Sequence, residues 1–459
     1  MSLSLARELA YDTYVAVMNH KKKPEEVLDD LYLEHKSKIK RLDRNFVKEV
    51  LFGSLRWHAK IYWILQNTSK RDLNKSSGEI RAALVMGTYQ IYYMDRVPDR
   101  AAVNESVEYV RKKGQANACS FVNGILRQIA RRAQYFPKPD KEAEPVEYLA
   151  LQYSHPEWIV RRWIRHFSFA RLSGILAANN KPPPISVRVN TLKTPLEETH
   201  LLQQKMLKQE SIHTERRPLR GSFRLKSAPK LGKDQLFGQG YYTIQDESSQ
   251  LVGHLVQPGE GEFIVDACAG PGGKISQIYE MSDGKAALLG IERDQRQFDR
   301  LVETMNRLGH SNAELLHQDF TSWSPGERVD KILLDAPCSG LGVLKRHPEG
   351  KWQKSEGAIA LMAETQHKLL RHALPRIKAG GELIYSVCSF EPEESQQQLG
   401  SLLKEYGDRI EVVAPGERLA DYYKKYVTRD QVLLVYAGNQ DEMDGFSAFV
   451  VRINQEIEP

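Results

Sequence analysis

"GEFIVDACAGPGGKISQIYEM", residues 261–281, decides the fold of this chain. An apolar run leads through a glycine-rich turn into a helical pattern, and that succession is typical of the first unit of an α/β sheet. The turn itself, "DACAGPGGK" at residues 266–274, has neither the G-x-G-x-x-G nor the G-x-x-x-x-G-K-[ST] spacing. A cradle for a pyrophosphate is therefore not the expected site.

The chain after this stretch repeats the alternation of strand and helix. Apolar strand patterns end near residues 292, 319, 335 and 388, and helical patterns separate most of them. Alternating elements of this length predict a parallel sheet with helices on both faces. We therefore expect residues 241–459 to form a Rossmann-like α/β domain.

Acidic side chains end the second and third of these strands. Glu292 can bind two ribose hydroxyls, and Asp319 can accept a hydrogen bond from an adenine amino group. This pair without a phosphate site suits S-adenosyl-L-methionine, although each acid could also cap the helix that follows it. The predicted cofactor site comprises Cys268, Ala269, Gly270, Pro271, Gly272, Gly273, Lys274, Glu292, Asp319 and Asp335.

Two cysteines and an acid share the same predicted edge of the sheet. Asp335 and Cys338 follow the fourth strand in "ILLDAPCSGLGVL", residues 332–344, and Cys388 ends the fifth. Free cysteines are most often inert core residues. Two thiols at one pocket suit nucleophilic catalysis, because a thiolate that adds to C6 of cytosine makes C5 able to take a methyl group. A carboxyl group at N3 or N4 would stabilise the charge that develops, and the residues alone leave open which thiol attacks.

The front of the chain predicts two further domains. Apolar residues spaced by three and four predict an all-α domain over residues 1–140, with Asp43 and Ser77 as N-caps and Gly114 as a helix stop. Short alternating patterns then predict a small α+β module over residues 145–240.

The charge of the chain is unevenly distributed. Residues 156–240 carry 16 Lys and Arg against 6 Asp and Glu, whereas residues 241–459 carry 23 against 34. This asymmetry indicates a polyanion-binding front half joined to a different kind of domain, although solvated helix faces would give a similar count. Candidate phosphate contacts are Arg161, Arg162 and Arg165.

Cysteine usage and hydropathy limit the class of protein. The 4 cysteines are far apart and form no C-x-x-C pair, which argues against structural zinc and a disulfide framework and fits a reducing cytoplasm. No apolar run is long enough to cross a membrane, and the first residues lack the features of a secretory signal. We expect a cytoplasmic protein without a metal site or a membrane partner.

Several segments together resemble one family. "DACAGPGGK", "LLDAPCSGLGV" and "YSVCSFEPEE" are similar to signature segments of the RNA (cytosine-5)-methyltransferases of the Sun/NOP type, as are "SVRVNTLK", "QDESSQ" and "DGFSAF". The front segments "VLFGSLRWHAKIYWIL" and "FVNGILRQIAR" resemble the NusB-like RNA-binding domain. That pairing is typical of the RsmB-type bacterial members, which modify 16S ribosomal RNA of the small subunit.

The resemblance implies roles for the site residues. It makes Cys388 the covalent nucleophile, Cys338 the thiol that helps to free the product, and Asp335 the acid at the base. It also implies that Lys274 pairs with an active-site acid, although an exposed first-turn lysine would be equally ordinary. Ser386 stands where the family usually has threonine, which keeps the hydroxyl, and Glu292 stands where related enzymes often have aspartate.

The segment "RHPEGKW", residues 346–352, follows the Cys338 loop. We expect Arg346, His347, Lys351 and Trp352 to line the RNA entrance, with a loop anchor in the core as the alternative for Trp352. The expected function is methylation of C5 of a cytosine in 16S ribosomal RNA with S-adenosyl-L-methionine. The alternatives are the same chemistry on transfer RNA and a non-catalytic RNA-binding assembly factor.

Overall fold

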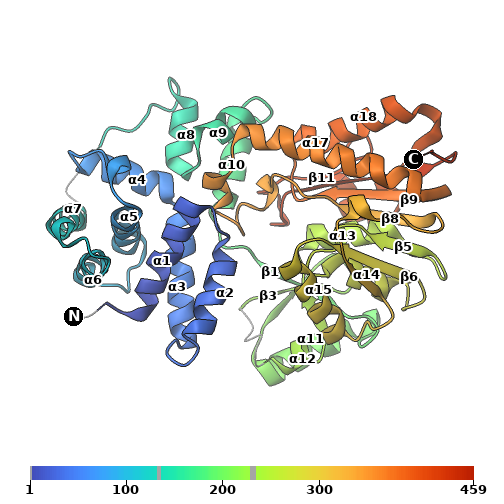
Figure 1. The fold of residues 1–459 in the computed structure, drawn as a ribbon, viewed down its shortest axis with the longest axis horizontal. Helices are drawn as coiled ribbons and strands as arrows, with labels where there is room; N and C mark the ends of the chain where they lie inside the picture. Colours follow the sequence, from blue (N-terminus) through green and yellow to red (C-terminus); the bar gives the residue numbers. More distant parts are fainter. Residues whose placement is uncertain (1–2, 132–135, 228–233, 459) are drawn as a thin grey trace. The chain divides into compact units, whose positions relative to one another are not determined.

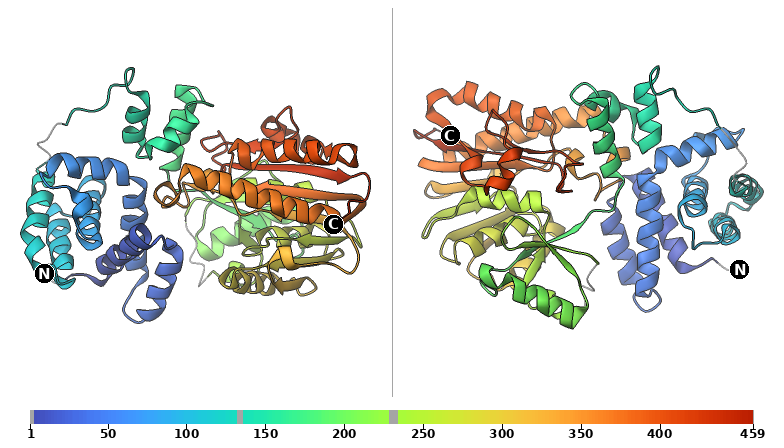
Figure 2. Two further views of the ribbon diagram at one scale, coloured as in Figure 1. Left: turned by 45° about the horizontal axis from the view of Figure 1, so that its top comes forward. Right: turned by 180° about the vertical axis from the view of Figure 1, so that it is seen from behind.

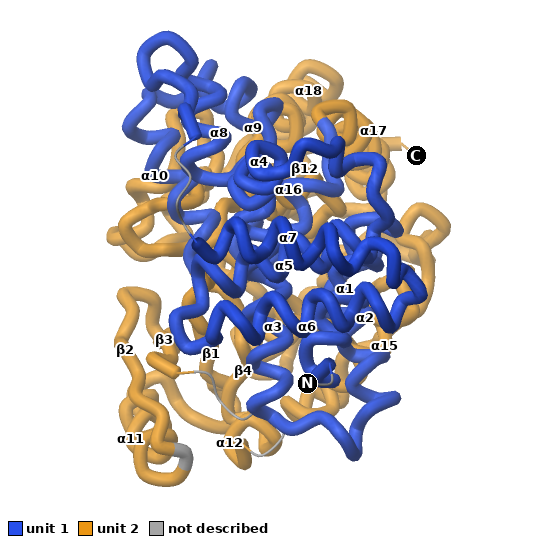
Figure 3. The backbone as a smooth tube through the Cα atoms, turned by 90° about the vertical axis from the view of Figure 1, so that its left-hand side faces the viewer, with its two compact units in different colours: residues 1–181, 344–355 blue, residues 182–343, 356–459 orange. Residues whose placement is uncertain are grey.

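The computed structural model describes residues 3–131, 136–227 and 234–458. Its chain forms two compact units (Figure 3). Unit 1 contains Met1–Lys181 together with Leu344–Ser355, and unit 2 contains Pro182–Val343 and Glu356–Pro459. A short segment that follows the Cys338 loop in sequence thus belongs to the unit built from the front of the chain.

Unit 1 is helical, as the sequence predicts. One apolar core joins its front helices, with Leu51, Val85 and Leu126 fully buried. The helices are α1 (Leu5–His20), α2 (Pro24–Glu34), α3 (Arg41–Arg56), α4 (His58–Thr68), α5 (Gly78–Tyr93), α6 (Asp99–Lys112), α7 (Cys119–Ala130), α8 (Pro145–Tyr153), α9 (Glu157–Trp163), α10 (Phe169–Asn179) and the short α16 (Gly350–Gln353).

Two of the three predicted helix boundaries in this unit are confirmed. The Ser77 hydroxyl accepts a hydrogen bond from the Ile80 amide at the start of α5, and Gly114, with φ 76°, follows α6. The prediction for Asp43 is wrong, because α3 begins earlier and Lys40 is its N-cap. Asp43 lies one turn inside α3, where its carboxylate accepts the Lys40 amide at 2.9 Å.

The segment Leu344–Ser355 closes several helix ends of unit 1. Lys351 is fully buried, and its ammonium donates to Arg56 O at 3.2 Å, Ser154 O at 3.2 Å and Asn180 Oδ1 at 2.6 Å. These acceptors lie at the C-terminal ends of α3, α8 and α10. Main-chain carbonyl groups at helix C-termini lack intrahelical donors and carry the negative end of the helix dipole, so the Lys351 side chain stabilises the ends of α3 and α8. Its third acceptor is the side-chain oxygen of the residue that follows α10.

The next two residues act in the same way. The Trp352 indole N–H donates to Leu55 O at 2.7 Å, and the Gln353 amide donates to Val17 O at 3.0 Å and Lys22 O at 3.1 Å. The prediction that Lys351 and Trp352 line an RNA entrance is therefore wrong, and Trp352 follows the alternative of a packed anchor. The signal was ambiguous because a basic and aromatic loop can bind either a polyanion or helix ends.

Unit 2 contains the small α+β module. Its antiparallel sheet has the order β2 (Thr214–Arg216), β3 (Ser222–Leu225), β1 (Ile185–Val189) and β4 (Tyr242–Ile244). Val187, Phe223 and Tyr242 form a separate apolar core with side chains of α11 (Thr199–Glu210). The short α12 (Gln235–Gly238) precedes β4.

The larger sheet of unit 2 has the order β10-β12-β9-β8-β5-β6-β7, with β11 paired to β12. Strands β5 to β9 run parallel, as predicted, whereas β10, β11 and β12 are antiparallel additions, so the sheet is mixed. The strands are β5 (Phe263–Asp266), β6 (Ala287–Glu292), β7 (Glu314–His317), β8 (Val329–Asp335), β9 (Ile377–Val387), β10 (Ile410–Val413), β11 (Leu433–Val435) and β12 (Phe446–Ile453).

Helices cover both faces of this sheet (Figures 1 and 2). Helices α13 (Glu247–Val256), α14 (Gly273–Met281) and α15 (Gln295–Leu308) pack in sequence along one face. Helices α17 (Glu356–Ala373) and α18 (Gln396–Tyr406) pack together against β8 and β10. In the described ranges, no helix is both long and apolar enough to cross a membrane.

A substitution tests the role of the buried lysine. We expect Lys351→Met to lower the free energy of unfolding of unit 1 by about 2–4 kcal/mol, because three buried oxygen atoms lose their donor. Urea unfolding followed by tryptophan fluorescence measures this, since most of the tryptophans lie in unit 1. Lys354→Met in the same segment is the control, and equal stability of the two variants would contradict the assignment.

Candidate active site

The carboxyl ends of three neighbouring parallel strands bring the predicted acid and both thiols together. β8 lies between β5 and β9, and Asp335 at its end is in register with Ser386. Cys388 directly follows β9, and the loop after β8 carries Cys338. β5 is also the strand at which the chain order reverses, since β6 lies on its other side, and α/β sheets bind ligands at such an edge.

The two thiols are in direct contact. The Sγ atoms of Cys338 and Cys388 are 2.9 Å apart, so either thiol can donate a hydrogen bond to the other sulfur. Both side chains are partly buried. The contact with Cys388 and the burial raise the pKa of Cys338 well above its ordinary value. The pair can hold one thiol and one thiolate, in which the thiol stabilises its neighbour's charge.

Asp335 is held by a cation and a hydroxyl. Its carboxylate contacts the Lys274 ammonium and accepts a hydrogen bond from the Ser386 hydroxyl at 2.7 Å. The Lys274 ammonium also lies 5.3 Å from the centre of the Phe446 ring. The structure thus brings Lys274 to the predicted active-site acid. Ser386, which stands where the family usually has threonine, supplies the hydroxyl that donates to this acid.

The glycine-rich turn leads from β5 into α14. Gly272 is the N-cap of α14 with φ 91°, a conformation that side chains rarely adopt, and a Cβ there would lie 3.0 Å from Leu301 Cδ1. Cys268 is partly buried, and burial raises the pKa of its thiol. Of the remaining predicted residues of the turn, Ala269 is buried, Pro271 is exposed, and Gly270, Gly273 and Lys274 are partly buried.

Glu292 and Asp319 lie at the ends of β6 and β7, where the sequence predicts them. Glu292 is 9% exposed, and its oxygens accept the Gly270 amide at 2.9 Å and the Asp294 amide at 2.8 Å. Asp319 is more exposed and accepts the Thr321 amide and hydroxyl at 2.8 and 2.7 Å. These hydrogen bonds lower the pKa of Asp319. Both acids therefore hold local backbone, and Glu292 also joins β6 to the glycine-rich turn.

Asp266 is a site residue that the sequence-based selection missed. It ends β5, is 2% exposed, and within the described residues neither of its carboxylate oxygens accepts a hydrogen bond. Its pKa is raised to about 7, chiefly by burial; the Lys274 charge opposes this shift and the Asp335 charge adds to it. An unpartnered buried carboxylate is costly unless a ligand supplies the partner. The signal was present, because Asp266 is another acid at the end of a strand.

A turn near the C-terminus supports the thiol loops. Gly445 N–H donates to Gly342 O at 2.8 Å, and Gly342 N–H donates to Cys388 O at 3.1 Å. A Cβ at Gly342 would lie 2.1 Å from Gly445 O, so the two backbones can approach only as glycines. The close approach ties the Cys338 loop to the residue that carries the second thiol.

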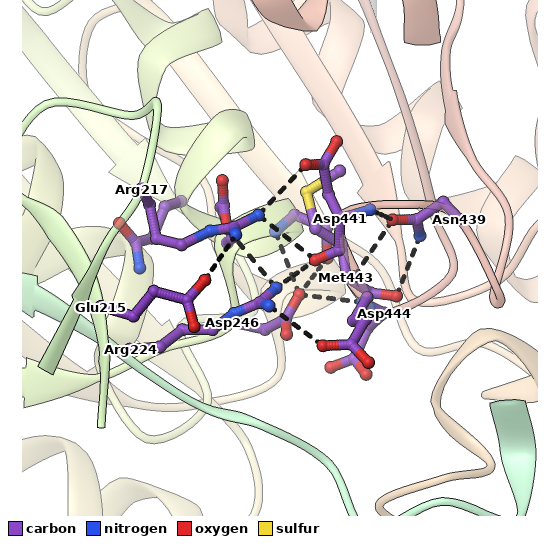
Figure 4. A network of polar contacts seen from close by, with 12 residues as sticks. Glu215, Arg217, Arg224, Asp246, Asn439, Asp441, Met443 and Asp444 are labelled. Carbon is purple, nitrogen blue, oxygen red and sulfur yellow. Dashed lines mark hydrogen bonds and ion pairs between the residues drawn. The ribbon is translucent and has the colours of Figure 1, made fainter. Parts of the chain in front are cut away.

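Arginine side chains from the small sheet hold this turn (Figure 4). Arg217 donates to Glu247 at 2.8 Å and to Asp441 Oδ1 at 3.2 Å, and Arg224 donates to the Asp441 carbonyl. Asn439 Oδ1 accepts the amides of Asp441 and Met443 at 3.0 and 3.2 Å. The turn before Gly445 is thus held by charges that the sequence pattern did not single out.

The parallel sheet, its glycine-rich first turn and the acids at successive strand ends define a Rossmann-like methyltransferase. The sequence matches the family described as "16S rRNA methyltransferase RsmB/F" over residues 254–451. It also matches the NusB family over residues 4–131 and the ferredoxin-like domain of the RsmF/B-like methyltransferases over residues 155–229. The helical and small α+β parts of the fold agree with these matches.

Relatives match this chain over most of its length. The probable ribosomal RNA small subunit methyltransferase B of Bacillus subtilis (strain 168) is 32% identical over 414 residues, which are 88% of this chain and 89% of that protein. The ribosomal RNA small subunit methyltransferase B of Yersinia pseudotuberculosis (serotype O:1b, strain IP 31758) is 32% identical over 81% of this chain and 85% of its own length. The chain belongs to the RsmB/F family of 16S rRNA methyltransferases.

Solved structures share the fold. The crystal structure of PH0851 superposes with a TM-score of 0.81 at 21% identity and covers 98% of this chain and 100% of its own. A methyltransferase homologue from Pyrococcus horikoshii matches with a TM-score of 0.56 at 25% identity, over 67% of this chain and 99% of its own.

The unpartnered carboxylate generates a pH-dependent prediction. Asp266 has a higher pKa in the folded chain than in the unfolded chain, so its contribution to stability is present at low pH and lost as pH rises through about 7. We expect the free energy of unfolding of Asp266→Asn to match that of wild type near pH 4, about the pKa of an unfolded aspartate, and to exceed it by about 2–4 kcal/mol at pH 8.5. Hydrogen exchange of β5 and β6 in urea measures the difference.

Asp319→Asn is the control for this prediction. The pKa of Asp319 is lowered, so that carboxylate is ionised throughout the range and its substitution should change stability by a constant amount. A difference between Asp266→Asn and wild type that does not vary with pH would contradict the assignment.

Proposed function

We propose that this chain transfers a methyl group from S-adenosyl-L-methionine to C5 of a cytosine in 16S ribosomal RNA, through a covalent bond between Cys388 and C6. The observation that carries the proposal is the 2.9 Å contact between two thiols beside Asp335 at one sheet edge. Membership of the family supports ribosomal RNA as the substrate. The relatives' names state that those proteins act on small-subunit ribosomal RNA.

The domain division is part of the same proposal. Residues 1–140 and the basic residues 145–240 bind RNA, and residues 241–459 carry out the chemistry. The positive charge of residues 156–240 supports phosphate binding, with an affinity that falls as salt rises. The target base must leave its stack, unless it is already unpaired, to meet a thiol at the end of a strand.

Each polar group of the site has a task in this reaction. The Cys388 thiolate forms the bond to C6, and the electron pair of the C5–C6 double bond shifts to C5, where it is delocalised towards C4 and N3 and can bond to the methyl group. The Asp335 carboxylate can accept from the cytosine amino group, while the Lys274 ammonium can donate to N3. After transfer a base removes the C5 proton, the bond between Cys388 and C6 breaks, and Cys338 assists this release.

The site fits the proposed cofactor. S-adenosyl-L-methionine supplies an electrophilic methyl group on a positively charged sulfur. The unpartnered carboxylate of Asp266 suits a cationic ligand, and the backbone from Gly270 to Lys274 opens the turn beside it. Glu292 keeps oxygen lone pairs for ribose hydroxyls, and Asp319 remains the proposed acceptor for the adenine amino group.

Two cysteine variants test the proposed function. Incubation with 16S ribosomal RNA and labelled cofactor should place label on C5 of cytosine. We expect Cys338→Ala to accumulate a protein–RNA adduct on a denaturing gel and Cys388→Ala to form none, because only the second change removes the nucleophile. The reversed pattern would overturn the assignment of the thiols, and label on transfer RNA alone would overturn the substrate.

A further inference from the structure

Glu394 is a buried carboxylate behind the Cys338 loop. It ends the short 3-10 turn Pro392–Glu394, is fully buried, and accepts the Ser339 amide at 2.7 Å, the Ser339 hydroxyl at 2.5 Å and the Gln366 amide at 3.0 Å. In the described part of the chain no Lys, Arg or His side chain forms an ion pair with it. Three neutral donors therefore stabilise its negative charge.

The same contacts fix both neighbours of Cys338. Gln366, which is fully buried on α17, also donates to Pro337 O at 2.9 Å. Pro337 and Ser339 are thus both held, and the side chain of Cys338 between them has a set direction. This arrangement explains how a loop outside the sheet keeps a sulfur atom at 2.9 Å from its partner.

Hydrogen bonds link the Glu394 carboxylate more directly to the loop of one thiol than to the loop of the other. Glu394 accepts a hydrogen bond from Ser339, the residue after Cys338. Its link to Ser389, the residue after Cys388, passes through the Ser339 hydroxyl, since Ser339 Oγ and Ser389 Oγ are 3.3 Å apart. Lys274 and Asp335 pair with each other. Glu391, three residues after Cys388, is a further buried acid, and its amide donates to Ser389 Oγ at 3.2 Å. The Glu394 charge is one cause of the raised pKa of Cys338, after the Cys388 contact and burial.

We propose that Glu394 is a positioning residue that keeps the shared proton on the Cys338 sulfur and so leaves the thiolate on Cys388. The inference rests on the proposed function, because it explains why Cys388 rather than Cys338 attacks. A buried negative charge disfavours a second negative charge beside it, so the sulfur nearer to Glu394 holds the proton. The Cys388 thiolate then supplies the electron pair of the new bond to C6, and no proton has to leave the pair beforehand.

The test compares thiol reactivity in Glu394→Gln and wild type. Glutamine retains the shape and an acceptor oxygen of glutamate but removes the charge. The reduced full-length protein is treated briefly with iodoacetamide at pH 7.5, and mass spectrometry gives the ratio of alkylated Cys388 to alkylated Cys338. We expect Glu394→Gln to lower this ratio about tenfold, the change that one pKa unit produces. The matched control is Glu393→Gln, which should leave the ratio unchanged.

Two outcomes would overturn the proposal. One is an unchanged ratio in Glu394→Gln, whether or not the alkylation of both thiols changes by the same factor, which would make Glu394 merely structural. The other is a ratio that rises. Wild-type protein gives a second measurement that needs no variant: Cys388 must become reactive at a lower pH than Cys338, and the reverse order contradicts the inference. Neither experiment uses RNA or cofactor, so its failure is separate from a failure of methyl transfer.

Discussion

The contact between two sulfur atoms at 2.9 Å is the constraint on which the catalytic half of this protein depends. Two thiols fifty residues apart in sequence meet only because β8 and β9 run parallel in register and end at one edge. The loops beyond those strands are then fixed from two sides. The close backbone contact between Gly342 and Gly445 fixes the end of the Cys338 loop, and hydrogen bonds from Ser339 and Gln366 fix its start: Ser339 donates to Glu394, and Gln366 donates to Pro337. A free pair of loop cysteines would lose this spacing to conformational entropy.

The acids at the strand ends divide into different tasks. Glu292 and Asp319 hold nearby backbone amides, so their charges are already stabilised by hydrogen bonds. Asp335 pairs with Lys274, and Asp266 keeps a buried carboxylate without a donor. Among the described residues, the site therefore combines acids whose charges are stabilised by hydrogen bonds or an ion pair with one buried acid that lacks a hydrogen-bond donor. This division is what a site for a positively charged donor and a polar base requires.

Much of this was predictable from the sequence. The helical front, the α/β alternation and the strand-end acids and thiols follow from periodicity and from the family's motifs. Periodicity did not predict the antiparallel strands β10 to β12, nor that the N-cap of α3 is Lys40 rather than Asp43. Periodicity also could not predict the burial of Lys351, because a local sequence pattern does not say which unit a loop packs with. The sequence also could not predict that the Asp266 carboxylate is buried without a hydrogen-bond donor among the described residues, because burial and donor positions depend on the three-dimensional arrangement.

The central claim is that Cys388 bonds to the base while Cys338 does not. RNA made with 5-fluorocytidine tests this directly, because fluorine at C5 cannot leave as a cation and the covalent complex persists. Wild-type protein is incubated with such 16S ribosomal RNA and S-adenosyl-L-methionine, and the attached nucleotide is located by mass spectrometry of the digested complex. The account predicts the nucleotide on the peptide that contains Cys388. A nucleotide on the Cys338 peptide, or no covalent complex at all, would contradict it.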